Sequence, residues 1–92
     1  MEPRRGVVAP ELERWRRNAE EGERRSAVVR FRAGTDPRGA ADRLAEIGME
    51  VVSGGPGSVI GNVTPEVLRL IGQETWVQAV EGPRTLRSLR NG

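Results

Sequence analysis

Residues 61–82 read GNVTPEVLRLIGQETWVQAVEG and hold the end of one strand, a helix and a second strand. Thr64 is a favoured N-cap residue and Pro65 suits the first helical position, so a helix is expected to begin here. Apolar residues recur until Gly72, a residue type that commonly ends helices. Residues 75–81 are rich in apolar side chains and favour a strand, which a Gly-Pro pair ends. The segment therefore predicts a strand–helix–strand unit.

The preceding half of the chain repeats this pattern. Residues 26–33 read SAVVRFRA and alternate between two faces, as a half-buried strand does. Asp36 is placed to cap the next helix and Gly48 to end it. Residues 53–57, SGGPG, favour a tight turn between two short strands. The sequence therefore predicts elements over residues 26–33, 36–47, 49–52, 58–63, 64–71 and 75–81.

The order strand–helix–strand–strand–helix–strand predicts an α+β fold of the ferredoxin-like βαββαβ type. With right-handed crossovers, the four strands form one antiparallel sheet and both helices lie on one face. The other face then has no helix of its own, and a half-apolar sheet face is a candidate docking surface. The residues expected on that face are Val28, Arg30, Arg32, Glu50, Val52, Ile60 and Asn62.

Three parts are expected: a partly helical N-terminal extension (residues 1–25), a ferredoxin-like domain (residues 26–83) and an extended, Arg-rich C-terminal tail (residues 84–92). Residues 1–9 are expected to be loose. Residues 10–25 carry the opposite-charge pairs of a solvated helix, with a narrow apolar stripe that includes Trp15. We favour a helix that lies loosely on the domain. The alternative is a partner-binding helix anchored by Trp15.

The composition lacks the usual catalytic and metal-binding side chains. The chain contains no Cys, no His and no Lys, and all 15 basic residues are Arg. Without His or Lys, serine-based catalysis has no general base, and the commonest zinc ligands are missing. The glycine-rich turn at residues 53–57 lacks the lysine of a phosphate-binding loop and precedes a strand. We therefore expect no enzyme, no cofactor and no metal site.

Charge is unevenly distributed along the chain. Residues 1–35 carry nine Arg and six Glu, residues 36–80 carry three Arg and six acidic residues, and residues 81–92 carry three Arg and one Glu. Nucleic-acid binding favours a continuous basic face with exposed aromatic residues, so this partner class is not favoured. No apolar run approaches membrane-spanning length, and no apolar h-region follows residues 1–5, so a cytoplasmic protein is expected.

Four short segments follow one another in the order of a known family. They are VVRF at residues 28–31, AEIGMEVV at residues 45–52, GNVTPEVLRLIGQE at residues 61–74 and WVQAVEG at residues 76–82. Together they resemble the inhibitor I9 family, the propeptides of subtilisin-like serine proteases and their free-standing relatives. The resemblance covers residues 26–89, about two-thirds of the chain. It implies a stand-alone protein-binding module that inhibits or chaperones a serine protease in trans.

The resemblance also implies how such a module binds. The open sheet face docks on two surface helices of the protease. Glu81, at the end of the last strand, accepts hydrogen bonds from helix N-termini, where the helix dipole favours a negative charge. The tail then runs extended through the active-site cleft and adds a strand to the enzyme. Leu89 would occupy the P1 pocket and Leu86 the P4 pocket, with Arg87 and Ser88 between them.

Two features depart from the family pattern, and other functions stay open. Pro83 stands where the family often has a second acidic residue, and the N-terminal helical segment is additional. One alternative is a small structural or regulatory subunit of a larger protein complex, bound through the sheet face and the N-terminal helix. Another is a regulatory domain that binds a small ligand at a dimeric sheet edge. The residues expected to contact a protein partner are Val28, Arg30, Val52, Ile60, Glu81, Leu86, Arg87, Ser88 and Leu89.

Overall fold

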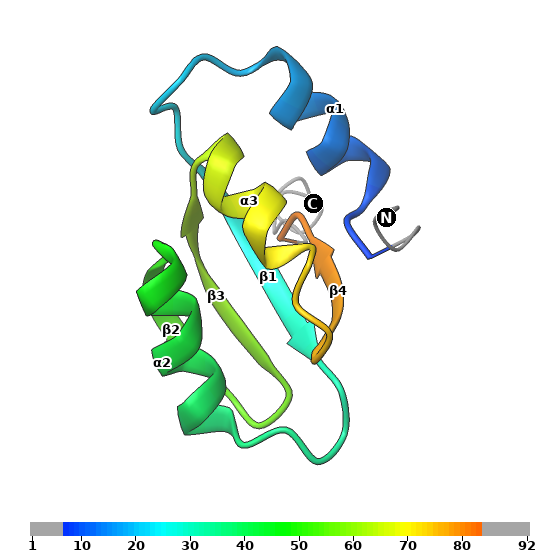
Figure 1. Ribbon diagram of the computed structural model, residues 1–92, viewed down its shortest axis with the longest axis vertical. Coiled ribbons are helices and arrows are strands. Elements are labelled where there is room, and N and C mark those ends of the chain that lie inside the picture. Colours follow the sequence, from blue (N-terminus) through cyan, green and yellow to red (C-terminus); the bar gives the residue numbers. More distant parts are fainter. Residues whose placement is uncertain (1–6, 84–92) are drawn as a thin grey trace, which may run out of the picture.

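Helices and strands alternate through residues 7–83, the part of the chain that this computed structural model describes (Figure 1). The elements are α1 (Pro10–Asn18), β1 (Arg25–Phe31), α2 (Pro37–Ile47), β2 (Glu50–Gly54), β3 (Ser58–Val63), α3 (Pro65–Ile71) and β4 (Val77–Glu81). All four predicted strands and both predicted domain helices are present. The N-terminal helix is also present, in a shorter form than predicted.

The strands form one four-stranded sheet in the order β2-β3-β1-β4. Each pair of neighbours is antiparallel, so β1 runs parallel to β2, and β3 runs parallel to β4. Helices α2 and α3 connect these parallel strands, and Figure 1 shows both in front of the sheet, with α1 beside α3. The predicted α+β class and antiparallel sheet are confirmed, and the arrangement is consistent with a ferredoxin-like fold.

The predicted helix ends are confirmed by local hydrogen bonds. The Asp36 side chain accepts a hydrogen bond from the Gly39 backbone N–H (3.0 Å) at the start of α2. The Thr64 hydroxyl accepts one from the Val67 backbone N–H (3.2 Å) at the start of α3. Gly48 ends α2 with φ of 125°, a backbone conformation that L side chains rarely adopt. Short-range sequence signals therefore fix the helices that cover one face of the sheet.

The face of the sheet that contacts the helices is apolar. In β1, Ala27, Val29 and Phe31 are buried on this side, and the residues between them are more exposed. No polar or charged residue of the described chain is buried. Burial of this apolar surface supplies the main favourable term in folding. The core consists of Val7, Leu12, Ala27, Val29, Phe31, Ala40, Leu44, Met49, Val59, Val63, Val67, Leu68, Ile71, Val77 and Val80.

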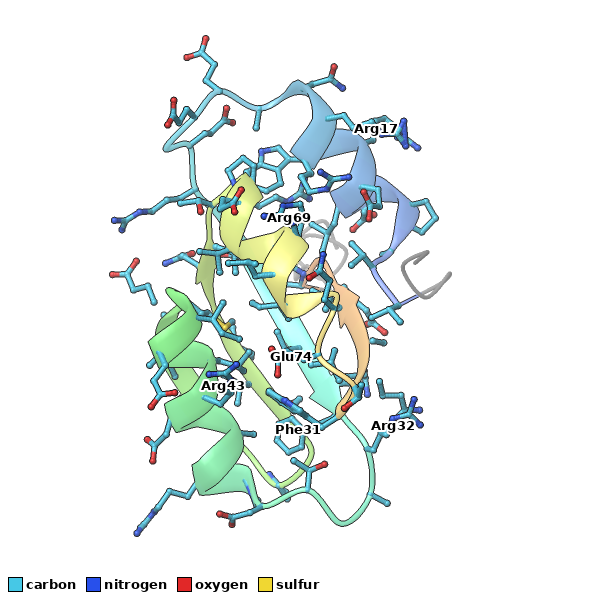
Figure 2. All side chains as sticks on the ribbon, viewed as in Figure 1. Arg17, Phe31, Arg32, Arg43, Arg69 and Glu74 are labelled. Atoms are coloured by element: carbon cyan, nitrogen blue, oxygen red, sulfur yellow. The ribbon has the colours of Figure 1, made fainter. Side chains whose placement is uncertain are left out.

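The loop before β4 is fixed to α2 and to the core. Arg43 of α2 forms an ion pair with Glu74 of the loop (Nη2 to Oε2, 3.3 Å), and Figure 2 shows the two side chains close together. The hydrogen bond to Glu74, and then the one to Glu46, raises the pKa of Arg43. Trp76 donates its indole N–H to Glu74 (2.8 Å) and lies against Phe31, with ring centroids 6.3 Å apart.

Several strand boundaries differ from the prediction. β4 begins at Val77, because Thr75 and Trp76 belong to the preceding turn, and β2 continues to Gly54. β1 ends before Arg32, which was expected on the open sheet face, and that expectation was wrong. The Arg32 backbone N–H donates to the Trp76 carbonyl (3.0 Å) and its Nε to the Thr75 carbonyl (2.9 Å). Arg32 therefore holds the loop before β4 in place.

The N-terminal helix is shorter than predicted. α1 ends at Asn18, and the chain then turns at Gly22, where φ is 88°. Glu23 stabilises this turn, because its carboxylate accepts a hydrogen bond from the Trp15 indole N–H (3.3 Å). A side-chain bond to the preceding helix and a glycine turn thus take the place of the last predicted helical turns. Trp15 packs against the core.

Residues before α1 were expected to be loose, and this was wrong for Val7, Val8 and Ala9. Val8 forms a parallel bridge with Val80 of β4. The Val80 N–H donates to the Val7 carbonyl (2.6 Å), and the Ala9 N–H donates to the Val80 carbonyl (2.8 Å). Val7 and Leu12 are buried. The segment therefore covers the outer edge of β4, which would otherwise present unpaired backbone groups.

Candidate protein-binding face

The candidate site is the side of the sheet opposite the helices, here called the open face. Its members follow from the strand register, because residues directly opposite each other on neighbouring antiparallel strands share a face. Three cross-strand rows make up the open face: Glu50–Asn62–Ser26, Ser53–Ile60–Val28–Glu81 and Ser58–Arg30–Ala79.

The middle row is apolar at its centre. Ile60 of β3 is 41% exposed and lies opposite Val28 of β1, which is half-buried. Val52 of β2 is 66% exposed and lies beside this row, where the register shifts between Val51 and Ser53. Within residues 7–83, Val52 and Ile60 are the large hydrophobic residues that are exposed. Val28, Val52 and Ile60 are called the apolar patch below.

One flanking row is polar and internally hydrogen-bonded. Asn62 donates its side-chain N–H to Glu50 (3.1 Å) and accepts a hydrogen bond from the Ser26 hydroxyl (3.2 Å). Arg24, just before β1, donates to the same Glu50 oxygen (3.1 Å). These groups already satisfy one another, so this side of the open face borders the apolar patch with ordered polar groups.

Glu81 ends the middle row and is the last residue of β4. Its Oε2 lies 3.3 Å from the Nε of Arg30, and the two side chains are 35% and 56% exposed. An exposed pair of this kind is weak and screened by salt. A carboxylate offers about four acceptor positions, so Glu81 can accept further hydrogen bonds while it contacts Arg30.

The structure brings most of the expected residues together. Those on or beside the open face are Val28, Arg30, Glu50, Val52, Ile60, Asn62 and Glu81. Sequence reasoning missed Ser26, Ser53, Ser58 and Ala79. Ser53 and Ala79 lie beside register irregularities in the β2–β3 and β1–β4 pairings, which change which residues face outward. A bulge leaves no reliable mark in the alternation of a single short strand. Whether these residues bind a partner stays a prediction.

Four further expected contact residues belong to the C-terminal tail. Leu86, Arg87, Ser88 and Leu89 lie outside the described residues. The described chain leaves the sheet after Glu81 and continues to residue 83. The tail therefore begins at the Glu81 end of the middle row.

Over residues 7–83, no group of three or more acidic side chains is placed to hold a metal ion. Among the helices of this same part, none is long and apolar enough to cross a membrane. The open face therefore offers an apolar patch, a hydrogen-bond acceptor at one end of the middle row and ordered polar groups along one side of it.

No protein-family model matches the chain, and no curated protein matches its sequence. The resemblance to the inhibitor I9 family therefore stays a prediction that depends on the four quoted segments.

Proposed function

We propose that this protein is a protein-binding module of the subtilisin-propeptide type, which inhibits or chaperones a serine protease in trans. We also propose that its fold is ferredoxin-like. Read from the other edge, the strand order is β4-β1-β3-β2, with two split strand–helix–strand units. The I9 resemblance implies this fold and this partner, and the geometry supports both.

The observation that carries the proposal is the uncovered open face with the apolar patch at its centre. Val52 and Ile60 are 66% and 41% exposed and form one contiguous patch with Val28, and a contiguous exposed apolar patch is the kind of surface that can mark an interaction site. The patch continues through Val28 to Glu81, the residue from which the chain leaves the sheet. The apolar patch and the residue from which the tail departs therefore lie along the same cross-strand row.

The apolar patch, Glu81 and the tail each have a role in the proposed complex. The apolar patch packs against side chains of surface helices on the protease. Glu81 accepts backbone N–H groups at a helix N-terminus, where the dipole strengthens binding of a carboxylate. The tail enters the active-site cleft, with Leu89 in the P1 pocket and Leu86 in the P4 pocket.

An inhibition assay against a panel of subtilisin-like enzymes tests this function. The full chain is expected to inhibit at least one of them, and a 1–83 truncation is expected to bind weakly and not inhibit. Leu89→Asp is expected to weaken inhibition by about tenfold or more, because it places a charge in an apolar pocket. Arg38→Ala, on the exposed surface of α2, is the matched control and should inhibit normally. Equal inhibition by residues 1–83 and the full chain would contradict the tail mechanism.

The subunit alternative predicts a different result. The apolar residues of α1 face inward, since Leu12 is buried and Trp15 packs on the core, so a permanent partner would also have to use the open face. Size-exclusion chromatography at natural abundance separates the two functions. Obligate association with a stable partner, together with no inhibition of any protease, would favour the subunit.

A further inference from the structure

By itself the apolar patch is too small for a stable interface between two copies of this chain, whereas in the proposed protease complex the tail supplies further contacts. The patch contains three aliphatic side chains, Val28, Val52 and Ile60, and polar rows border it on both sides. Stable protein–protein interfaces bury about 1,200–2,000 Å² in total. A patch of this size matches a short chain segment that carries two apolar side chains.

The chain itself supplies such a segment next to the patch. Glu81, Val28 and Ile60 are successive cross-strand neighbours, so Ile60 lies two strands from the point where the chain leaves the sheet. Two strand spacings amount to about 10 Å. Leu86 follows Pro83 by three residues and Leu89 by six. A polyproline II chain rises about 3.1 Å per residue with three residues per turn, so it would cover roughly 9 Å and 19 Å over these lengths and keep both leucines on one side. The two leucines can therefore reach the apolar patch.

The charges around the patch suit this segment. Glu81 lies at one end of the middle row, and Glu50 lies on the neighbouring row at the β2 edge. Both carboxylates are partly exposed, at 35% and 56%, and each has acceptor positions beyond its present arginine partner. The tail carries Arg84, Arg87 and Arg90 around its two leucines. Basic side chains thus alternate with the apolar ones along a path with acidic groups at both ends.

We propose that residues 84–89 lie across the open face of the same molecule when no partner is bound. Leu86 covers Val28 and Ile60, and Leu89 covers Val52. The contact hides the apolar patch and withholds the tail from other proteins. Its regulatory consequence rests on the proposed function: the leucines that enter a protease cleft must first leave the patch. Docking in cis does not itself require that function.

The absence of cysteine makes a direct test possible in the full chain. Ser88→Cys introduces a single thiol between the two leucines, to which a nitroxide spin label is attached. Methyl NMR spectra are then compared with the label oxidised and reduced. We expect selective loss of methyl intensity for Val28, Val52 and Ile60. The methyl groups of Leu44 in α2 and Val67 in α3, which are buried between the helices and the sheet, should lose less intensity.

A matched variant separates docking from mere tethering. Leu86→Ser and Leu89→Ser, combined in the labelled Ser88→Cys chain, keep the tether and the arginines but remove the apolar contacts. The selective loss at the patch should then disappear. If patch and buried methyls lose intensity equally, or if the double serine variant behaves like its parent, the proposal is wrong.

Two further outcomes have defined meanings. In the first, spin-labelled chain without isotope enrichment is mixed with an excess of isotope-enriched chain that carries no spin label. Intensity loss at the apolar patch of the enriched chain would show docking between copies and would overturn docking in cis. Failure of the protease assay would leave the NMR result intact, because this measurement contains no protease. Conversely, a working inhibitor without selective intensity loss would refute the cis contact alone.

Discussion

The two faces of the sheet are built from the same strands and carry opposite chemistry. In β1, Ala27 and Val29 are fully buried against the helices, whereas Val28 and Arg30, which alternate with them, lie on the open face. The helix-covered face excludes polar side chains, and the open face mixes ion pairs and hydrogen bonds with exposed aliphatic groups. The helix-covered face thus stabilises the fold, and the exposed aliphatic groups of the open face are what the proposed docking would use.

Replacement of one isoleucine by alanine on each face is expected to give the largest difference in the free energy of unfolding. Ile71 of α3 is fully buried in the core on the helix-covered side, and Ile60 of β3 is 41% exposed on the open face. Ile71→Ala is expected to lower the free energy of unfolding by about 2–5 kcal/mol, because it leaves a cavity in the core. Ile60→Ala should lower it by about 1 kcal/mol or less. Urea denaturation monitored by circular dichroism measures both.

The stability change of Ile60→Ala decides whether the open face belongs to the core. If Ile60→Ala destabilised the domain as much as Ile71→Ala, the open face would be part of the core of the free protein. Such a result would remove the main reason to regard it as a binding surface.

Alanine substitutions at two separate glycines, Gly61 and Gly57, test how closely the helix-covered face is packed. A Cβ atom at Gly61 would collide with the carbonyl oxygen of Glu50 and lie 3.0 Å from Cε of Met49. Gly61→Ala is therefore expected to lower the free energy of unfolding by about 1–3 kcal/mol through overpacking. Gly57→Ala is the control, because its Cβ would meet nothing within 4 Å, and it should change stability by about 0.5 kcal/mol at most. Similar losses for both variants would mean that the steric clash of Cβ at Gly61 does not set the effect, because removing glycine entropy from the unfolded chain would stabilise both.

Local signals explain why much of the fold could be predicted from the sequence. The caps at Asp36 and Thr64 need only residues within three positions of themselves, and each forms the expected bond. Alternation in residues 26–31 likewise identifies both faces of β1, since side chains on a strand point to opposite sides in turn. Such features depend on neighbours in the chain, and a sequence shows those directly.

Features that depend on distant partners could not be predicted. The pairing of Val7–Ala9 with Val80 joins the two ends of the described chain, and the two valines alone do not identify so distant a partner. The shift between Val51 and Ser53 arises from pairing with β3, so it is visible only once the strands are aligned. Arg32 was misplaced for the same reason, because the carbonyls it binds belong to the loop before β4.

The smallest expected effect concerns the ion pair on the open face. Arg30→Gln, Glu81→Gln and the double variant form a double-mutant cycle, which isolates the coupling between the two side chains. Their exposure, 56% and 35%, predicts a coupling of about 0.2–1 kcal/mol that falls as salt is added. Urea denaturation at low and high ionic strength measures it. A weak, salt-sensitive coupling means that Arg30 releases Glu81 readily to a helix N-terminus, as the proposed docking requires. A coupling well above this range and insensitive to salt would mean that Arg30 holds the carboxylate firmly, and Glu81 would then be a poor contact for a partner.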